Sequence, residues 1–252
     1  MNERKTVSVA LAAYNGMRFL DGQIDSILPQ LESGDELVVS CDPSTDGTWE
    51  HLKTLSEKDG RIRPFPGTGQ GVQENFENAL THCVGDVIFL SDQDDVWLPG
   101  KVAAVLDALE KTGAGIVLHD ARVTDAEGNI LEPSFFRMRG CKPGYLRNLL
   151  KNSYIGCCMA FRKEVLLPAL PFPGNIPMHD QWLGLIGSRF FPVVFLEQPL
   201  ILYRRHGENV SSDRHAGFSQ MLQWRFRLWQ DLTERTREYR KKDAELTRNR
   251  PR

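Results

Sequence analysis

Three carboxylates stand close together directly after an apolar run. Asp92, Asp94 and Asp95 follow the residues VIFL at positions 87–90. Like charges this close repel one another and lose hydration when buried, so a bound divalent cation is the simplest way to hold them together. Carboxylate oxygens suit Mg²⁺ or Mn²⁺, and such an ion usually also takes substrate phosphates. The local sequence therefore predicts a metal and phosphate site at a strand end, with a solvated acidic turn as the alternative.

The first half of the chain alternates apolar runs with helical patterns, which is the order that would position these acids. Repeated strand–loop–helix units favour a parallel sheet with right-handed crossovers. Such a sheet binds ligands in the crevice at the carboxyl ends of its strands, so we expect the three carboxylates there. The predicted strands are 6–13, 35–40, 61–65 and 87–90, and the predicted helices are 19–28, one beginning near Thr48, and 72–83.

The second half is less regular, because prolines at 168, 171, 173 and 177 exclude regular structure between them. From Phe218 onward a long polar helix is predicted, with aromatic residues at helical spacing. It either packs its aromatic start onto the domain or offers Trp224, Trp229 and its arginines to a membrane or partner surface. Other expected elements are a helix from Pro99, a strand at 116–119, a turn at Gly128-Asn129, an apolar strand segment at 152–161, a short helix at 162–167, a helix opening at 178–182, and strands at 191–196 and 201–204.

The composition bounds the class of protein. The 252 residues are 25% charged and 41% hydrophobic, which is typical of a soluble globular chain. A net charge of −2 gives no case for a nucleic-acid partner. Five cysteines without metal-type spacing favour a reducing compartment over a disulfide framework. The N-terminal apolar run is too short for a signal peptide, and no stretch approaches the roughly 20 apolar residues of a membrane span, so we expect a cytoplasmic protein.

Five motifs occur in the order found in a known family. They are AAYNG at 12–16, VVSCDPSTDGT at 38–48, FLSDQDDVW at 89–97, HDQW at 179–182 and YRRHGENVS at 203–211. Together they resemble the nucleotide-sugar glycosyltransferases of GT-A fold, in the large inverting family 2 whose bacterial members include rhamnosyltransferases of surface-polysaccharide pathways.

The resemblance implies an α/β GT-A fold with a Rossmann-like, mostly parallel sheet flanked by helices and a C-terminal helical extension. It places the glycosyltransferase domain at 1–215, with a nucleotide-binding half at 1–97 and an acceptor-binding half at 98–215. The helical extension would cover 216–252.

The resemblance also implies a donor site. An aromatic ring such as Tyr14 suits any planar base, and Asp42 could accept the imide N–H of uracil or thymine. Relatives often have two acids where this chain has Cys41 followed by Asp42, and Asp46 is expected to cap or stabilise its loop. The residues expected to bind the nucleotide are Ala13, Tyr14, Asn15, Asp42, Asn75, Asp92 and Gln93.

The catalytic and metal-binding roles follow from the same motifs. Asp180 matches the family's catalytic base, and its place at a helix start would favour the ionised form; a simple helix cap is the alternative. The divalent ion, Mn²⁺ or Mg²⁺, would be held by Asp92, Asp94 and His206, with Asp95 supporting them or capping a helix. The residues expected to contact substrate are Gly156, His179, Trp182 and Arg204.

These roles predict a UDP- or dTDP-sugar donor and a glycan or lipid-linked glycan acceptor, with peripheral contact at the inner face of the membrane or a homodimer through the C-terminal helix. Two alternatives stay open. The central acids also fit a haloacid-dehalogenase-type phosphatase with Asp92 as nucleophile, although that motif normally follows the first strand. The chain could also be a non-catalytic binder of nucleotide-sugars or glycans, with Cys41 as a sign of decay.

Overall fold

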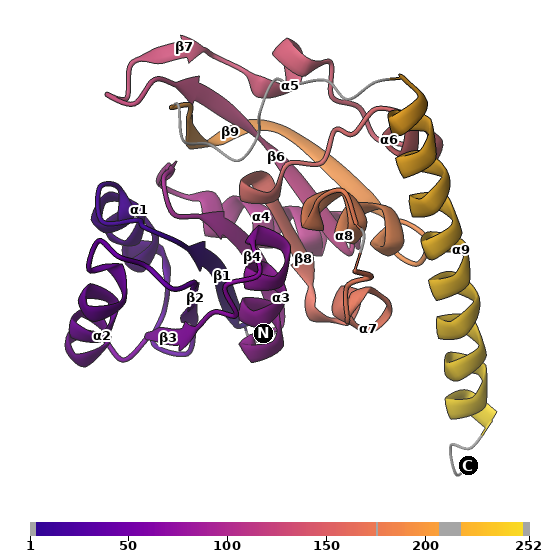
Figure 1. Cartoon of the computed structure of the whole chain (residues 1–252), viewed down its shortest axis with the longest axis horizontal. Coiled ribbons are helices and arrows are strands. Elements are labelled where there is room, and N and C mark those ends of the chain that lie inside the picture. Colours follow the sequence, from indigo (N-terminus) through magenta and orange to yellow (C-terminus); the bar gives the residue numbers. More distant parts are fainter. Residues whose placement is uncertain (1–3, 175, 207–217, 249–252) are drawn as a thin grey trace.

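The computed structural model describes residues 4–174, 176–206 and 218–248. One sheet runs through this part of the chain in the order β3-β2-β1-β4-β8-β6-β9-β5, and β7 pairs with β6 (Figure 1). The strands are β1 (Val7–Ala13), β2 (Glu36–Cys41), β3 (Ile62–Pro66), β4 (Val87–Asp92), β5 (Val96–Trp97), β6 (Ile116–Thr124), β7 (Ile130–Glu132), β8 (Met159–Arg162) and β9 (Val193–Arg204).

Helices flank this sheet. The α-helices are α1 (Leu20–Ile27), α2 (Thr48–Lys58), α3 (Val72–His82), α4 (Lys101–Thr112), α5 (Phe135–Arg139), α6 (Tyr145–Leu150), α7 (Leu166–Ala169), α8 (His179–Gly187) and α9 (Phe218–Arg248), and short 3₁₀ helices span Leu28–Gln30, Gly156–Cys158 and Lys163–Val165.

The sheet separates two hydrophobic cores, because successive side chains of a strand point to opposite faces. Val87 and Phe89 of β4 pack into a core shared with α1, α2 and α4. Ile88 and Leu90 pack into the other core, with α3, α7, α8 and α9. Burial on both faces explains why β1, β2 and β4 are mostly apolar along their length. The predicted mixed α/β fold with a mostly parallel inner sheet is confirmed.

The second half departs from the parallel pairing of the first half, within the mostly parallel sheet that was expected. Strands β1 to β4 pair in parallel, but β8 lies antiparallel between β4 and β6. The segment 152–161 is not a continuous strand, since a 3₁₀ helix over Gly156–Cys158 precedes β8. The predicted strands at 191–196 and 201–204 form one strand, β9, which pairs with β6 through register shifts near Pro199. The predicted turn at Gly128-Asn129 joins β6 to β7.

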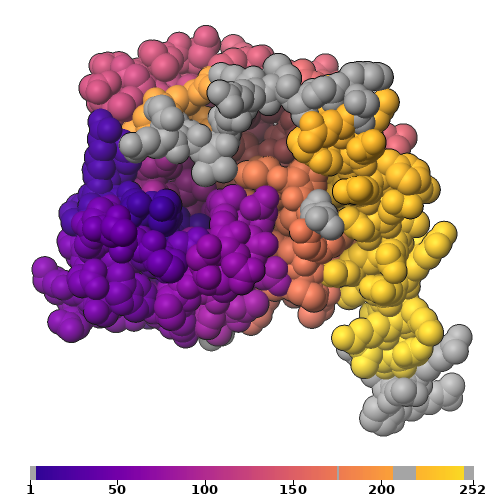
Figure 2. Space-filling view, viewed as in Figure 1, coloured from indigo at the N-terminus to yellow at the C-terminus, as the bar shows by residue number. Residues whose placement is uncertain are grey.

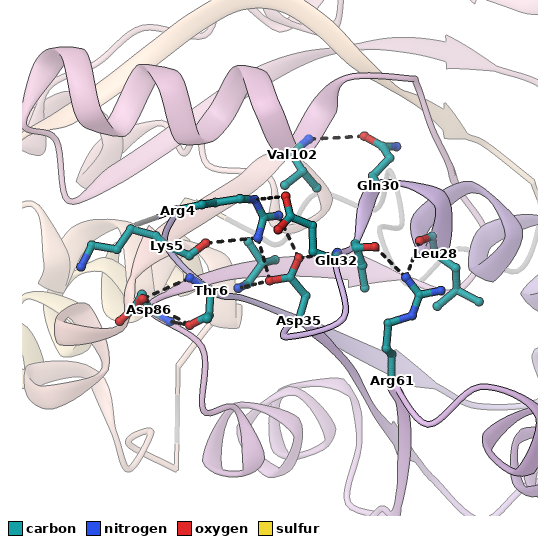
Figure 3. Close-up of polar contacts among 12 residues, drawn as sticks. Arg4, Lys5, Thr6, Leu28, Gln30, Glu32, Asp35, Arg61, Asp86 and Val102 are labelled. Atoms are coloured by element: carbon teal, nitrogen blue, oxygen red, sulfur yellow. Dashed lines mark hydrogen bonds and ion pairs between the residues drawn. The ribbon is translucent and has the colours of Figure 1, made fainter. Parts of the chain in front are cut away.

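A polar network ties the amino ends of the strands together (Figure 3). The buried carboxylate of Asp35 accepts hydrogen bonds from the Val7 and Glu32 amides, each at 2.8 Å, and from both terminal nitrogens of Arg4 at 2.9 and 2.8 Å. Burial raises the pKa of Asp35, but the bonds from Arg4 and the two amides outweigh it and leave that pKa below its ordinary value. This network fixes the start of β1 beside β2, at the end of the sheet opposite Asp92.

The last helix packs through its first half and leaves the body of the molecule through its second half. Leu228 and Leu232 are buried in the core beside α7 and α8. From Lys241 to Leu246 every residue is exposed, and Figure 2 shows this end of α9 projecting from the globular part. Among the described residues, no helix has the length and apolar character needed to cross a membrane.

Candidate functional site

Strand β4 ends at Asp92, so this carboxylate lies at the carboxyl end of the sheet. The backbone after it is fixed by Gln23 of α1, whose buried amide donates to Ser91 Oγ at 2.7 Å and to the Asp92 carbonyl at 2.9 Å. Removal from water and the nearby Asp95 and Asp94 carboxylates raise the pKa of Asp92 well above its ordinary value. Asp180 contributes to the same rise, so its charge acts on Asp92 although the two residues are far apart in sequence.

Asp95 lies deeper than the sequence suggests. It is fully buried, accepts the Arg204 amide at 2.9 Å, and its Oδ2 atom has no hydrogen-bond partner in the described part of the chain. Burial and the Asp94 charge raise its pKa to about 7. One ligand atom each of Asp92, Asp95 and Cys157 lie within 4.8 Å of one another. The predicted helix-capping role of Asp95 is wrong, because β5 follows it and the next helix begins at Lys101.

The other two predicted metal ligands, Asp94 and His206, contact each other and are not part of the cluster of Asp92, Asp95 and Cys157. His206 follows β9, and its Nε2 atom lies 2.8 Å from Asp94 Oδ2. The imidazole stacks on Phe19 at 4.9 Å between ring centroids, and the Arg204 guanidinium lies 4.7 Å from the same ring. Residues 112 positions apart are thus brought to one place, and the Phe19 ring contacts both the His206 imidazole and the Arg204 guanidinium. The rest of the last motif, residues 207–211, lies outside the described residues.

A buried lysine lies beneath the acids, and sequence reasoning missed it. Lys101 has no exposed surface, donates to the Cys157 carbonyl at 2.9 Å and lies 3.9 Å from the centre of the Trp97 ring. Burial lowers its pKa to about 8, although the charges of Asp92 and Asp95 oppose that shift. A lysine in the first turn of a helix is ordinarily solvated, so no feature of the sequence singled it out.

The surface predicted to hold the base is formed by three loops. Tyr14 is 57% exposed, and its amide and carbonyl are both bonded at 2.8 Å to the Gln93 side chain. Asn15 adopts φ 45°, a left-handed conformation that asparagine tolerates, and its carboxamide oxygen accepts the Thr45 amide at 2.8 Å. Asp46 accepts the Thr48 amide at 3.0 Å, in the loop-stabilising role expected for it. Tyr14 therefore presents its ring to solvent on a braced loop.

Polar groups of the second strand end gather next to this tyrosine loop. The Ala13 carbonyl accepts from the Asp42 amide at 2.9 Å and from Asn75 Nδ2 at 3.1 Å. Asp42 Oδ1 accepts the Gly69 amide at 2.9 Å. Asn75 Oδ1 is buried and has no hydrogen-bond partner among the residues described. A Cβ atom on Gly67 would lie only 2.8 Å from this oxygen, so glycine lets the loop approach the two side chains. The predicted base-contacting residues lie together.

Asp180 occupies the first turn of α8, on the other side of the crevice. Its carboxylate accepts the Gly156 amide at 3.1 Å and the Gln181 amide at 2.6 Å. Burial raises the pKa of Asp180 to about 6, against the lowering effect of these bonds. The expectation that the helix start would dominate its ionisation is therefore corrected. The group is still mostly ionised at neutral pH, with a pKa close to that of an effective general base.

Three of the predicted substrate contacts lie behind this carboxylate. A Cβ atom on Gly156 would lie 2.9 Å from His179 Nε2, so the glycine makes room for α8 itself. His179 is 3% exposed and stacks on Phe76 at 3.9 Å, and burial lowers its pKa to about 3. Trp182 has no exposed surface and donates its indole N–H to the Ala169 carbonyl at 2.9 Å. In this structure Trp182 therefore lies in the hydrophobic core.

Two cavities in the described part of the chain lie in different regions of the fold. One of about 720 Å³ lies between α6, α8 and α9 and reaches Gln181, the neighbour of Asp180. The other, of about 700 Å³, lies at the amino ends of the strands around Asp35 and Arg61. The first reaches the site through Gln181, next to Asp180, whereas the second lies at the amino ends of the strands, away from the acids.

This arrangement is accompanied by a match to a family model. Residues 8–167 match glycosyl transferase family 2, and the chain belongs to that family. The family predicted from the motifs is thus confirmed.

Named relatives and a solved structure agree with this assignment. The chain is 26% identical over 218 residues to an uncharacterized glycosyltransferase of Nostoc sp., covering 81% of this chain and 66% of that protein. It is 27% identical over 211 residues to the Escherichia coli UDP-Glc:alpha-D-GlcNAc-diphosphoundecaprenol beta-1,3-glucosyltransferase WfgD, covering 82% and 80%. The mannosyltransferase PcManGT from Pyrobaculum calidifontis, in complex with GDP-Man and Mn²⁺, superposes with a TM-score of 0.60 at 19% identity, covering 83% of this chain and 59% of that one.

Proposed function

We propose that the protein is a metal-dependent, inverting glycosyltransferase that moves a sugar from a UDP- or dTDP-sugar to a hydroxyl of a glycan or lipid-linked glycan. The observation that carries the proposal is the convergence of acids from separate parts of the chain. Asp92 at the end of β4 has a raised pKa to which Asp180 of α8 contributes. The glucosyltransferase name of the Escherichia coli relative, with its UDP-sugar donor and lipid-linked acceptor, supports the same substrate classes.

The cluster of acids fits a divalent cation. Asp92, Asp94 and His206 would hold it with Asp95, whose Oδ2 atom has no other described partner. Burial, and then repulsion between neighbouring carboxylates, raises the pKa values of Asp92 and Asp95, and a bound cation would favour their ionised forms. When bound, Mn²⁺ or Mg²⁺ would stabilise the charge that develops on the departing nucleoside diphosphate.

The rest of the chemistry needs one base and good positioning. Asp180 would take the proton from the attacking hydroxyl, while the Gly156 and Gln181 amides keep its carboxylate oriented. Tyr14 would pack against the base, and Asp42 and Asn75 would bond its polar edge. Arg204 lies beside His206, where it could pair with phosphate oxygens. The protein would act in the cytoplasm at the inner face of the membrane, as a lipid-linked acceptor requires.

Nucleotide binding and turnover test the proposal. UDP or dTDP should raise the melting temperature in the presence of Mn²⁺ or Mg²⁺ and have little effect in EDTA. Asp92→Asn should abolish the metal-dependent part of that rise, whereas Asp107→Asn, a matched change on the exposed face of α4, should not. The donor site is refuted if neither nucleotide raises the melting temperature with either metal present.

The alternatives give different results. A non-catalytic binder would show the same nucleotide-induced stabilisation but release no nucleoside diphosphate with any acceptor. A phosphatase of the haloacid-dehalogenase type would hydrolyse a generic phosphate monoester, which a transferase should ignore. In such phosphatases the motif normally follows the first strand. Here β1 ends in Ala13 and Asp92 ends β4, which speaks against a phosphatase.

A further inference from the structure

Large apolar side chains are exposed along the first turns of α9. Leu222, Phe226 and Trp229 are 48%, 57% and 44% exposed. They recur at the i, i+4, i+7 spacing that places residues on one face of a helix, and the rings of Phe226 and Trp229 lie 5.9 Å apart. Trp224, 46% exposed, lines the cavity beside α6. Exposed apolar residues gathered in this way mark an interaction surface.

The surroundings of these residues are basic. Residues 133–152 contain five lysines and arginines and no acid, and residues 220–230 contain two arginines and no acid, in a chain whose net charge is −2. The two segments meet, since Arg139, Leu150 and Lys151 line the same cavity as Trp224 and Arg225. We call this region the basic aromatic surface. Its members are Arg137, Arg139, Lys142, Arg147, Leu150, Lys151, Leu222, Trp224, Arg225, Phe226, Arg227 and Trp229.

We propose that the basic aromatic surface binds an anionic lipid bilayer, with the first turns of α9 lying at the membrane interface. Tryptophan rings favour the headgroup level, and each nearby lysine or arginine adds attraction to anionic lipids. A second copy of the chain fits poorly, because a two-fold interface would set the same seven positive charges against one another. The charge pattern thus favours a negatively charged partner over a second copy of the chain.

This contact also orients the crevice. Trp224 and Arg225 line the same cavity as Pro177 and Gln181, and Gln181 is next to Asp180 in the sequence. A hydroxyl at the level of the lipid headgroups would therefore approach the side of the molecule on which Asp180 lies. That consequence rests on the proposed function, whereas binding to the bilayer does not.

Sedimentation with lipid vesicles tests the membrane contact without donor or acceptor. The full chain should bind vesicles that contain phosphatidylglycerol and bind poorly to phosphatidylcholine alone, with binding weakened by salt. Arg225→Glu with Arg227→Glu should lower the partition coefficient at least about thirtyfold, because each basic residue contributes about fivefold near an anionic surface. The triple change Leu222→Ser, Phe226→Ser and Trp229→Ser should weaken binding while leaving its preference for anionic lipid in place.

The far end of α9 supplies a matched control. Lys241→Glu with Lys242→Glu makes the same charge change about 21 Å along the helix from Arg227, beyond the roughly 10 Å screening length at ordinary salt. This variant should bind vesicles like the wild type, and circular dichroism should show that all variants keep their helix content. Three results would overturn the proposal: equal binding to neutral and anionic vesicles, equal loss in the control, or no vesicle binding together with a dimer that the triple change dissociates.

Discussion

Replacing Asp180 with asparagine should stabilise the protein at high pH while destroying its activity. Burial raises the pKa of Asp180 from 3.8 to about 6, so the folded state holds its proton more tightly than the unfolded state does. A raised carboxyl pKa contributes stability that is fully present below the unfolded value and is lost as the pH rises through the folded value. The ionised form of Asp180 therefore lowers the free energy of unfolding at neutral pH.

The size of this cost follows from the shift. Each pKa unit corresponds to about 1.4 kcal/mol, so full ionisation of Asp180 lowers the free energy of unfolding by about 3 kcal/mol. Part of this loss in the free energy of unfolding has already occurred at pH 4.5, and the remaining loss of about 2 kcal/mol occurs between pH 4.5 and pH 8. The difference in unfolding free energy between Asp180→Asn and the wild type should rise by that amount over this range. Transfer should fall by about 10² to 10⁴, as for loss of a general base, with nucleotide affinity nearly unchanged.

Urea unfolding at several pH values in EDTA measures this difference, since EDTA removes any effect of bound metal. Asp125→Asn is the matched control. Hydrogen bonds from Asn129 lower the pKa of Asp125, so above about pH 5 the group is ionised in both states and its variant should differ from wild type by a constant amount. A flat difference for Asp180→Asn would refute the assignment of Asp180 as a buried, strained carboxylate. A large loss of nucleotide affinity would remove it from the role of base.

Four further outcomes are expected. The kcat/KM of the wild type should rise with pH through about 6 and then level off, as Asp180 becomes ionised. Gly156→Ala should lower kcat by about tenfold to a hundredfold with little change in donor KM, because its methyl group would displace His179, and His179→Ala in the same chain should restore part of the rate. Asp35→Ala should lower the free energy of unfolding by about 2–3 kcal/mol at pH 7, since buried amides lose their acceptor, and by somewhat less at pH 3, where protonation has begun to remove the wild-type contribution. Lys101→Met should destabilise by about 3 kcal/mol at pH 8, as expected for one member of a buried charge cluster, and by less once Mn²⁺ is added.

The inner strands were predictable because each is buried on both faces. Their sequences are mostly apolar, and the position of Asp92 at the end of β4 follows from where the apolar run of that strand stops. The single strand β9 was not predictable in the same way. Pro199 breaks its pattern, and only pairing with the long strand β6, through shifts in register, carries the strand past it.

The residues of the site likewise fall into two groups, those that sequence motifs indicate and those that only the fold brings together. Asp180 and His206 were found because their motifs keep an order along the chain, and the fold then brings them to the acids. The burial of Asp95, Lys101 and Cys157 could not be found from spacing, because these residues meet between the turn after β4, α4 and the 3₁₀ helix before β8. Periodicity reports which face of one element is apolar, and it does not report which elements close over a polar group.

The convergence of these acids on one nucleotide and metal site is tested most directly by anomalous diffraction from crystals soaked with Mn²⁺ and UDP. We predict one strong manganese peak next to Asp92, Asp94 and His206. The diphosphate of UDP should contact this ion, and the Asp180 carboxylate should face the bound nucleotide. Manganese bound elsewhere, or UDP at the amino ends of the strands around Asp35, would contradict this account.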